Sequence, residues 1–185
     1  MVDEILAETK GEMDKAVEAF QREVGTVRTG RANSSLLDSI RVEYYGSQVS
    51  VNQVASIAIP EPRLIVLQPF DKTVIRELEK AIQASNLGLN PSNDGNVVRL
   101  PIPQLTEERR KDLVKVVKGM GEDCKVSVRN HRRDGNDLLK AGQKDGEIPE
   151  DEAKRGTEQI QQVTDGHVKR IEALLAEKEA EIMEV

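Results

Sequence analysis

The chain has 185 residues and a net charge of −6, with 32% charged, 37% hydrophobic and only 2% aromatic residues. This length fits one or two compact domains. A core with so few aromatic residues must be aliphatic, which favours a helical bundle and argues against modules that stack single-stranded bases on aromatic platforms.

The first segment, from Val2 to about Arg28, is predicted to form an amphipathic helix. Its apolar residues recur at spacings of three, four, seven and eight, as on one face of a helix. They are Ile5, Met13, Val17, Phe20, Val24 and Val27. Gly30 and the polar residues 31–35 then end the helix.

Between residues 31 and 104 the pattern becomes that of a small α+β domain. Period-two alternation or β-branched runs predict strands at 40–44, 49–51, 57–59, 64–67 and 97–100. Residues 73–85 are predicted to form a helix, and residues 91–95 a turn.

Helix returns after Thr106, an expected N-cap followed by two glutamates in the first turn, and runs to about Lys144. Residues 145–149 form a turn, and a third helix starts at Glu150 with Pro149 near its first position. The apolar stripe of the third helix is close to a heptad. It contains Ile160, Val163, His167, Ile171, Leu174, Lys178 and Ile182.

Three stripes, two of them joined by a short turn, favour an elongated antiparallel three-helix bundle. The bundle takes residues 1–30 and 105–185, and the α+β domain at 31–104 is inserted into it. The chain crosses between the two domains near 30–31 and again near 103–105, so we expect hinges there. The hinge residues are Gly30, Arg31, Pro103, Gln104 and Leu105.

The helix from Lys111 to Lys140 separates its side chains by charge. With Leu113 as the reference direction and 100° per residue, an apolar face lies within roughly 60° of Leu113. This face holds Leu113, Val117, Met120, Cys124, Val128, His131, Gly135 and Leu138. A basic sector lies roughly 100° to 200° round and an acidic one beyond it. The basic sector holds Lys111, Lys115, Lys118, Lys125, Arg129, Arg132, Arg133 and Lys140.

Two interpretations of the basic sector are open. Both other helices are acidic, so the lysines and arginines could form salt bridges between helices or be a solvated face. However, residues 125–133 hold four cations and no anion, three of them arginines within five residues. A guanidinium group presents a planar fork that suits phosphate, and a locally basic surface binds nucleic acid even in an acidic protein. Without aromatic residues on this face, contact should be to backbone and shape.

The chain lacks the usual signals of an enzyme or a metal site. No phosphate-binding loop pattern is present, and Gly119-Met120-Gly121 lacks the third glycine of a dinucleotide motif. His131 and His167 both fall on apolar stripes, so we interpret them as core histidines rather than metal ligands. We therefore expect no catalytic residue, metal or cofactor.

The amino terminus and the cysteine content indicate a cytoplasmic protein. Residues 1–6 resemble neither a secretory signal nor a transit peptide, and no stretch is apolar enough to span a membrane. Cys124 is the only cysteine, so no internal disulfide can form. We interpret it as a small buried hydrophobe rather than a reactive thiol.

Several blocks, in order along the whole chain, resemble the bacterial ribosome recycling factor family. They are Arg28-Thr29-Gly30-Arg31-Ala32, Val42-Glu43-Tyr44-Tyr45-Gly46, Leu87-Gly88-Leu89-Asn90-Pro91, the run from Leu105 to Leu113, and Val128-Arg129-Asn130-His131-Arg132-Arg133-Asp134. The resemblance implies an L-shaped α+β protein in which a three-helix bundle carries a β/α/β sandwich domain on two hinge strands.

The resemblance also implies a function. Such a factor acts on the ribosome that remains on messenger RNA after termination and, with elongation factor G and GTP, separates the subunits and releases the messenger. Initiation factor 3 acts afterwards. The factor itself hydrolyses nothing and is expected to be a monomer.

Matching the motifs residue by residue gives the expected contacts with large-subunit ribosomal RNA. The resemblance places Arg132 first, with Arg129 and Arg133 beside it and Lys125 on the same face. Arg28 and Arg31 lie in the Arg-Thr-Gly-Arg-Ala block at the joint.

Two other functions are open from the residues alone. One is a helical adaptor whose acidic third helix binds basic proteins, which would not sediment with ribosomes. The other is a phosphate-processing enzyme, which a GTP or ATP turnover assay would reveal.

Overall fold

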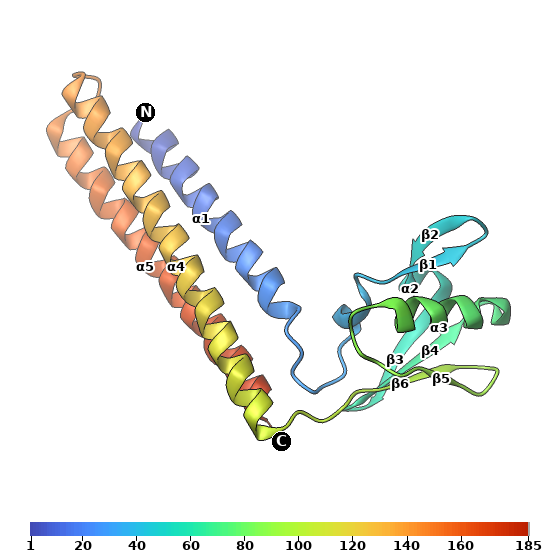
Figure 1. Cartoon of the computed structure of the whole chain (residues 1–185). Helices are drawn as coiled ribbons and strands as arrows, with labels where there is room; N and C mark the ends of the chain where they lie inside the picture. Colours follow the sequence, from blue (N-terminus) through green and yellow to red (C-terminus); the bar gives the residue numbers. More distant parts are fainter. Residues whose placement is uncertain (185) are drawn as a thin grey trace. The chain divides into compact units, whose positions relative to one another are not determined.

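The computed structural model describes residues 1–184, which form two compact units (Figure 1). Residues 1–27 and the chain from Arg110 onward make a helical unit, here called the bundle unit. Residues 28–109 make a mixed unit, here called the insert unit. The α+β class is confirmed. The expected hinges near 30–31 and 103–105 stay predictions.

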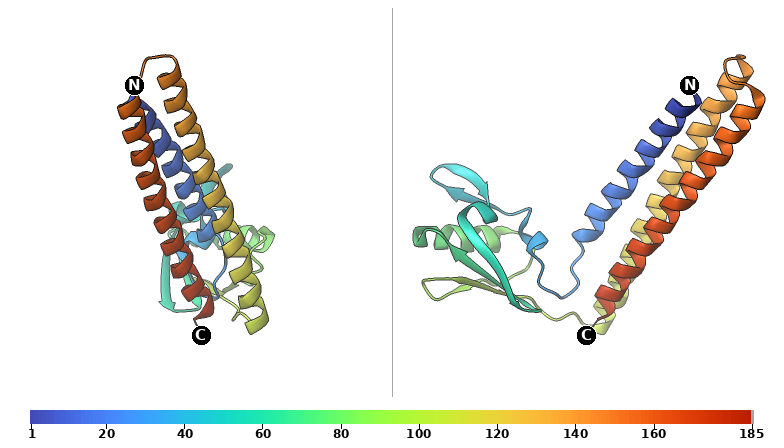
Figure 2. Two further views of the ribbon diagram at one scale, coloured as in Figure 1. Left: turned by 90° about the vertical axis from the view of Figure 1, so that its left-hand side faces the viewer. Right: turned by 180° about the vertical axis from the view of Figure 1, so that it is seen from behind.

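Three long helices build the bundle unit: α1 (Val2–Gly25), α4 (Glu107–Lys144) and α5 (Glu150–Met183). Helix α4 runs in the direction opposite to α1 and α5 (Figures 1 and 2), as predicted for an antiparallel bundle. Aliphatic side chains from all three helices are fully buried between them. They include Met13, Val17, Val117, Val128, Leu139, Ile160, Ile171 and Ile182.

Helix α1 buries the predicted stripe but ends earlier than predicted. Phe20 and Val24 are buried, whereas Val27 lies beyond the helix and is only partly buried. The helix ends at Gly25 because Thr26 closes its last turn: its hydroxyl donates a 2.7 Å hydrogen bond to the Glu23 carbonyl. Such local side-chain bonds compete with continuation of a helix.

The predicted core face of α4 is wrong at Leu138, and Met120 and His131, which were expected in the core, are only partly buried. Leu138 is 48% exposed, whereas its neighbour Leu139 is fully buried. Leu113 lies at one edge of the buried stripe rather than at its centre, so a helical wheel anchored on it is rotated. The true stripe is shifted toward the basic sector, and Arg132 consequently lies at its flank, half-buried.

Glycines mark the closest approaches of the helices. A Cβ atom added at Gly135 would lie 2.5 Å from the Thr9 hydroxyl oxygen, and one added at Gly121 would overlap the Leu175 side chain. Glycine costs about 1 kcal/mol relative to alanine inside a helix. Here the absence of a side chain allows α4 to pack closely against α1 and α5.

The ends of α4 carry recognisable capping groups. The Thr106 hydroxyl accepts a 3.1 Å hydrogen bond from the Arg109 backbone N–H, which confirms the predicted N-cap. At the other end Gly146 has a φ of 77°, and the N–H of Ile148 donates to the Gly142 carbonyl at 3.0 Å. This left-handed cap reverses the chain into α5.

The insert unit is built on an antiparallel sheet of four strands in the order β3-β4-β6-β5. These strands are β3 (Ala55–Glu61), β4 (Leu64–Pro69), β5 (Ser92–Asn93) and β6 (Val98–Pro101). Helix α3 (Ile75–Ala84) lies between this sheet and a separate hairpin of β1 (Arg41–Tyr44) and β2 (Ser47–Ser50), as Figures 1 and 2 show. The predicted β/α/β sandwich is confirmed.

Short helical turns complete the insert unit. They are η1 (Ser34–Leu37), α2 (Val51–Val54) and η2 (Lys72–Val74). The predicted strand at 49–51 is therefore wrong at its end, because Val51 begins α2 and is buried there. Side chains from both sheets and α3 form the core, including Val42, Ile65, Leu67, Leu78, Ile82, Val98 and Leu100.

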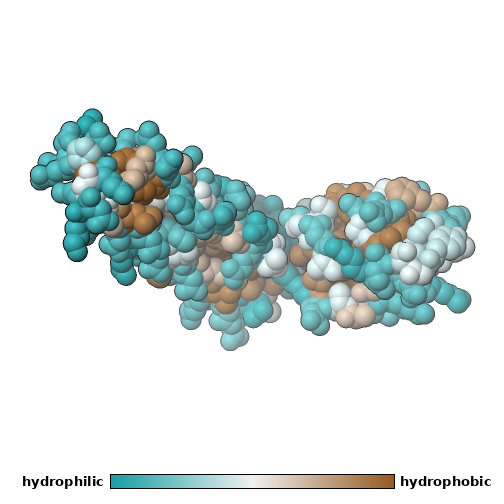
Figure 3. All heavy atoms as spheres, turned by 90° about the horizontal axis from the view of Figure 1, so that it is seen from above, coloured by the Kyte–Doolittle hydropathy of each residue, from teal (hydrophilic) through white to brown (hydrophobic). Residues whose placement is uncertain are grey.

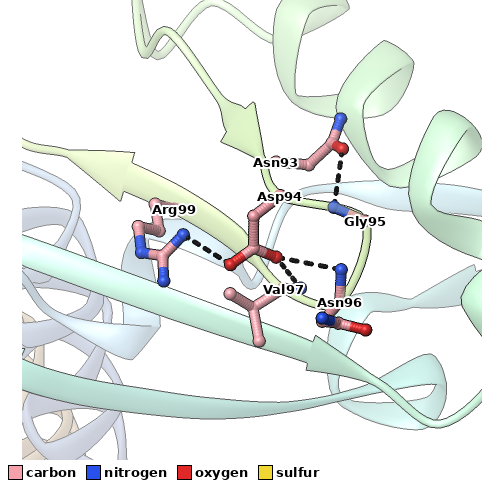
Figure 4. A network of polar contacts seen from close by, with 6 residues as sticks. All are labelled: Asn93, Asp94, Gly95, Asn96, Val97 and Arg99. Carbon is pink, nitrogen blue, oxygen red and sulfur yellow. Dashed lines mark hydrogen bonds and ion pairs between the residues drawn. The ribbon is translucent and has the colours of Figure 1, made fainter.

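The turn between β5 and β6 is held by one carboxylate (Figure 4). Asp94 accepts hydrogen bonds from the backbone N–H of Val97 (3.0 Å) and Asn96 (2.9 Å) and from the Arg99 guanidinium (2.9 Å). These bonds, that of Val97 first, lower the pKa of Asp94 to about 2. The predicted turn at 91–95 lies slightly later, because Ser92 and Asn93 pair with β6.

Candidate nucleic-acid interface

Three arginines on one stretch of α4 form the main candidate surface, here called the arginine cluster (Arg129, Arg132 and Arg133). Arg129 and Arg133 are exposed, and within residues 1–184 neither has a hydrogen-bond or ion-pair partner. Arg132 is half-buried, and its Nη1 donates a 3.3 Å hydrogen bond to Gln161 Oε1 on α5. That partner is a neutral amide, so the positive charge of the cluster is not neutralised.

Lys125 belongs to the same face but has a different environment. Its side chain is only 13% exposed, and its Nζ lies 3.5 Å from carboxylate oxygens of both Glu122 and Glu172. Glu172 is on α5, so Lys125 joins two helices of the bundle unit. Here the salt-bridge interpretation of the basic sector describes the geometry.

The basic face continues along α4 on both sides of the arginine cluster. Lys115, Lys118 and Lys140 are exposed. Hydrophilic residues cover most of the face of the bundle unit drawn in Figure 3. The exposed cations thus extend along one side of α4 on both sides of the arginine cluster.

Arg28 and Arg31 lie in the insert unit, apart in the chain from the arginine cluster. Arg28 is half-buried, and its Nη2 donates a 2.6 Å hydrogen bond to the Asn86 carbonyl. Arg31 is exposed. Arg28 thus contributes to the fold of the insert unit, while most of the Arg31 side chain is accessible.

Both segments that contain the expected hinge residues are fastened to one turn of the insert unit. The N–H of Ala32 donates to the Pro62 carbonyl at 2.7 Å, and the N–H of Ile102 donates to the neighbouring Arg63 carbonyl at 2.8 Å. Gly30 has a φ of 77°, and a Cβ there would lie 3.2 Å from Leu105 Cγ. Ala32 and Ile102 are therefore both fixed to the insert unit by backbone hydrogen bonds.

An apolar cavity of about 170 Å³ lies between these two segments within the insert unit. It is lined by Arg28, Gly30, Arg31, Leu36, Leu87, Leu89, Ile102, Pro103, Gln104 and Leu105. All five expected hinge residues thus lie around one cavity, next to Arg28.

Two further candidate groups, His167 and Cys124, are buried in the bundle unit. His167 is buried, with one ring nitrogen 2.7 Å from the Val163 carbonyl and the other 2.6 Å from Asp14 on α1, so it is the core histidine that was predicted. Cys124 is buried, and burial raises the pKa of its thiol.

Within residues 1–184 no group of three metal-ligating side chains is present, and no helix is both long and apolar enough to cross a membrane.

Sequence reasoning missed the burial of Arg110. This arginine is among the buried residues of α4, and its Nε has no hydrogen-bond partner within residues 1–184. Its position one helical turn before Leu113, at the edge of the apolar stripe, is the signal that could have shown it.

Together these features define a protein of two units, a three-helix bundle that carries a row of arginines on one helix and a β/α/β unit. The chain belongs to the ribosome recycling factor family, a family of translation factors: the family model "Ribosome recycling factor" matches residues 20–183.

Relatives and solved structures agree with this assignment over the full chain. The ribosome-recycling factors of Geobacillus kaustophilus and Bacillus subtilis are each 55% identical over 185 residues, which covers all of both chains. A solution structure of a ribosome recycling factor matches with a TM-score of 0.83 at 41% identity, covering 100% of this chain and 98% of that one.

A second solved structure presents a relative in a functional assembly. It describes T. thermophilus ribosome recycling factor and E. coli elongation factor G bound to the E. coli post-termination complex. The match has a TM-score of 0.69 at 43% identity and covers all of both chains.

Proposed function

We propose that this protein separates post-termination ribosomes into subunits and releases messenger RNA, acting in the cytoplasm with elongation factor G and GTP, with initiation factor 3 acting downstream. The bundle unit binds large-subunit ribosomal RNA through the arginine cluster. Arg132 makes the central contact and Arg129 and Arg133 the flanking ones. The observation that carries the proposal is the cluster of guanidinium groups without carboxylate partners on a family member's longest helix.

The physical basis of binding is the exchange of counterions for arginines on the RNA backbone. Arg129 and Arg133 have no ion pair to break, so they lose little on binding. Arg132 gives up one hydrogen bond to a neutral amide. Lys125 would have to leave two carboxylates, so we assign it the smallest share.

The insert unit is the part that the partner moves. Its two ends are fastened to the Pro62–Arg63 turn, so the unit turns as one body about Gly30, Arg31, Pro103, Gln104 and Leu105. Arg28 and Arg31, beside this joint, contact RNA once the bundle unit is bound. GTP hydrolysis on elongation factor G supplies the free energy, and this chain hydrolyses nothing. A GTP turnover assay on the isolated protein tests that statement.

The test of the arginine cluster is co-sedimentation with post-termination ribosomes. Arg132→Gln removes the charge but keeps a polar side chain, so far-ultraviolet circular dichroism should be unchanged while affinity falls roughly tenfold or more, as expected for one charge-assisted hydrogen bond. Wild-type affinity in this variant would refute the role of Arg132.

A matched control is Arg170→Gln on α5. Arg170 is exposed and lies beside Lys10, Asp14 and His167, where α5 faces α1 rather than α4. The Arg170→Gln variant loses one positive charge, as Arg132→Gln does, but at a different surface. Its affinity for the ribosome should therefore stay close to that of the wild type. An equal loss in both variants would indicate that only total charge matters.

A further inference from the structure

The insert unit carries an aromatic group in which Tyr44 packs against the core and the other two rings are exposed. Of the four aromatic residues in the chain, Tyr44, Tyr45 and Phe70 are in this unit. Tyr45 is 82% exposed and Phe70 is 71% exposed, while the rings of Tyr44 and Tyr45 pack edge to face with centroids 4.5 Å apart. Together with Asp71 these residues are here called the aromatic edge.

Tyr45 occupies a backbone position that is unfavourable for its residue type. It forms the two-residue loop of the β1–β2 hairpin with Gly46, and both residues have positive φ, at 47° and 79°. Such loops favour asparagine followed by glycine, and a bulky side chain in this region is an outlier. The Tyr45 ring contacts Tyr44 and Asp71 but is otherwise in solvent, so burial in the core does not offset the strained backbone, which points to a role outside the fold.

The aromatic edge also contains a carboxylate that stays ionised. The pKa of Asp71 is lowered by hydrogen bonds, first from the Thr73 backbone N–H at 3.0 Å and also from the Tyr45 side chain. This contact places Asp71 beside Tyr45, and Phe70 directly precedes Asp71. The group therefore combines exposed aromatic rings with a fixed negative charge.

That combination selects the kind of partner. A carboxylate repels the phosphates that surround RNA bases. Lysine and arginine side chains are attracted both to the carboxylate and to the faces of aromatic rings. Exposed aromatic residues are also the side chains that most often dominate protein–protein binding. The chemistry of the aromatic edge thus fits a protein surface that bears basic side chains.

We propose that the aromatic edge is the surface through which the insert unit is pushed, contacting basic side chains of elongation factor G. This inference rests on the proposed function, because it assigns the contact to the partner named there. The bundle unit holds the RNA, and the aromatic edge receives the force.

The test uses a substitution that should not harm the fold. Tyr45→Asn removes the ring and places a favoured residue in the loop, so the thermal midpoint should be unchanged or higher. We expect ribosome co-sedimentation without elongation factor G to be unchanged. Subunit splitting with elongation factor G and GTP should fall roughly tenfold or more, as for a binding hot spot. Phe70→Ser should act in the same direction.

Two further variants test what causes a loss of splitting. One removes the charge of the aromatic edge without harming the fold, and the other removes an exposed apolar side chain elsewhere in the insert unit. Asp71→Asn keeps an oxygen that can accept from Thr73 but removes the charge, so splitting should fall while stability is kept. Ile59→Ser changes a 43% exposed side chain in β3, away from the aromatic edge in sequence, and should leave splitting unchanged.

Each outcome has a distinct meaning. Wild-type splitting by both Tyr45→Asn and Phe70→Ser would overturn the inference and leave the proposed function intact. Loss of ribosome binding by Tyr45→Asn without elongation factor G would also overturn it, since the aromatic edge would then bind the ribosome itself. Absence of splitting by the wild-type protein would refute the proposed function instead.

Discussion

The bundle unit and the insert unit expose opposite kinds of side chain. The bundle unit buries Phe20, its only aromatic residue, and presents guanidinium groups to solvent. The insert unit presents aromatic rings, and the guanidinium of Arg28 in this unit donates a hydrogen bond to the Asn86 carbonyl. Electrostatic attraction acts over about 10 Å and needs no fixed register, whereas aromatic contact needs close fit. In the proposed function the arginine cluster, and not the acidic bundle unit as a whole, therefore holds the polyanion, while the aromatic edge makes the defined contact with a protein.

The largest expected effect tests whether the bundle unit depends on close helix packing. Gly135→Ala should lower the free energy of unfolding by about 1–3 kcal/mol, as for an overpacked core, because the new Cβ would meet both the hydroxyl and the methyl group of Thr9. Circular dichroism follows the bundle unit, while the fluorescence of Tyr44 and Tyr45, the only tyrosines, follows the insert unit. Only the first signal should shift.

Gly119→Ala is the matched control, since a Cβ there meets nothing within 4 Å. This variant should gain stability, by about 1 kcal/mol on helix propensity. Equal effects of the two substitutions would show that the glycines are not packing sites.

A smaller effect should separate structural from binding cations within the basic face. Lys125→Ala should lower the free energy of unfolding by about 1 kcal/mol because two carboxylates lose their partner. Arg129→Ala should leave stability within about 0.5 kcal/mol, as is usual for a surface position, but should weaken ribosome binding. Chemical denaturation and co-sedimentation of both variants measure the difference. The reverse pattern would contradict the assignment.

The smallest effect concerns acid stability of the insert unit. The pKa of Asp94 is lowered to about 2 in the folded turn. The ionised carboxylate therefore stabilises the folded state at pH values above the ordinary pKa of an aspartate. That contribution should be lost as pH falls from about 4 toward about 2. Asp94→Asn should be less stable than wild type near neutral pH, and tyrosine fluorescence should show the two converging in acid. A constant gap across this range would show that the charge is irrelevant.

Much of the bundle unit could be predicted because its pattern is local. Thr106 and Pro149 mark helix starts, and the stripe of α1 follows simple periodicity. The stripe of α5 is predicted less well, since Thr164 and Leu175 are buried where Val163 and Leu174 were expected. The burial of Leu139 instead of Leu138 could not be predicted, since the centre of a buried stripe depends on where the neighbouring helices lie. The close approach at Gly135 has the same cause.

The candidate surfaces were predicted unevenly for related reasons. The arginines of α4 share one sector of a helical wheel, so their common face follows from spacing. The ion pair between Lys125 and Glu172 depends on the register of α4 against α5, which the sequence alone does not specify. The aromatic edge joins Tyr45 to Asp71 through tertiary folding, and the left-handed backbone of Tyr45 has no signal beyond the glycine that follows it.

The most direct test of the arginine cluster is the salt dependence of ribosome binding. For wild type and Arg132→Gln, the logarithm of the association constant is measured against the logarithm of salt concentration. Both should fall as salt rises, and the variant's slope should be shallower by about one, the value for one lost phosphate contact. Parallel lines, or an affinity of the wild type that does not depend on salt, would contradict binding through phosphates.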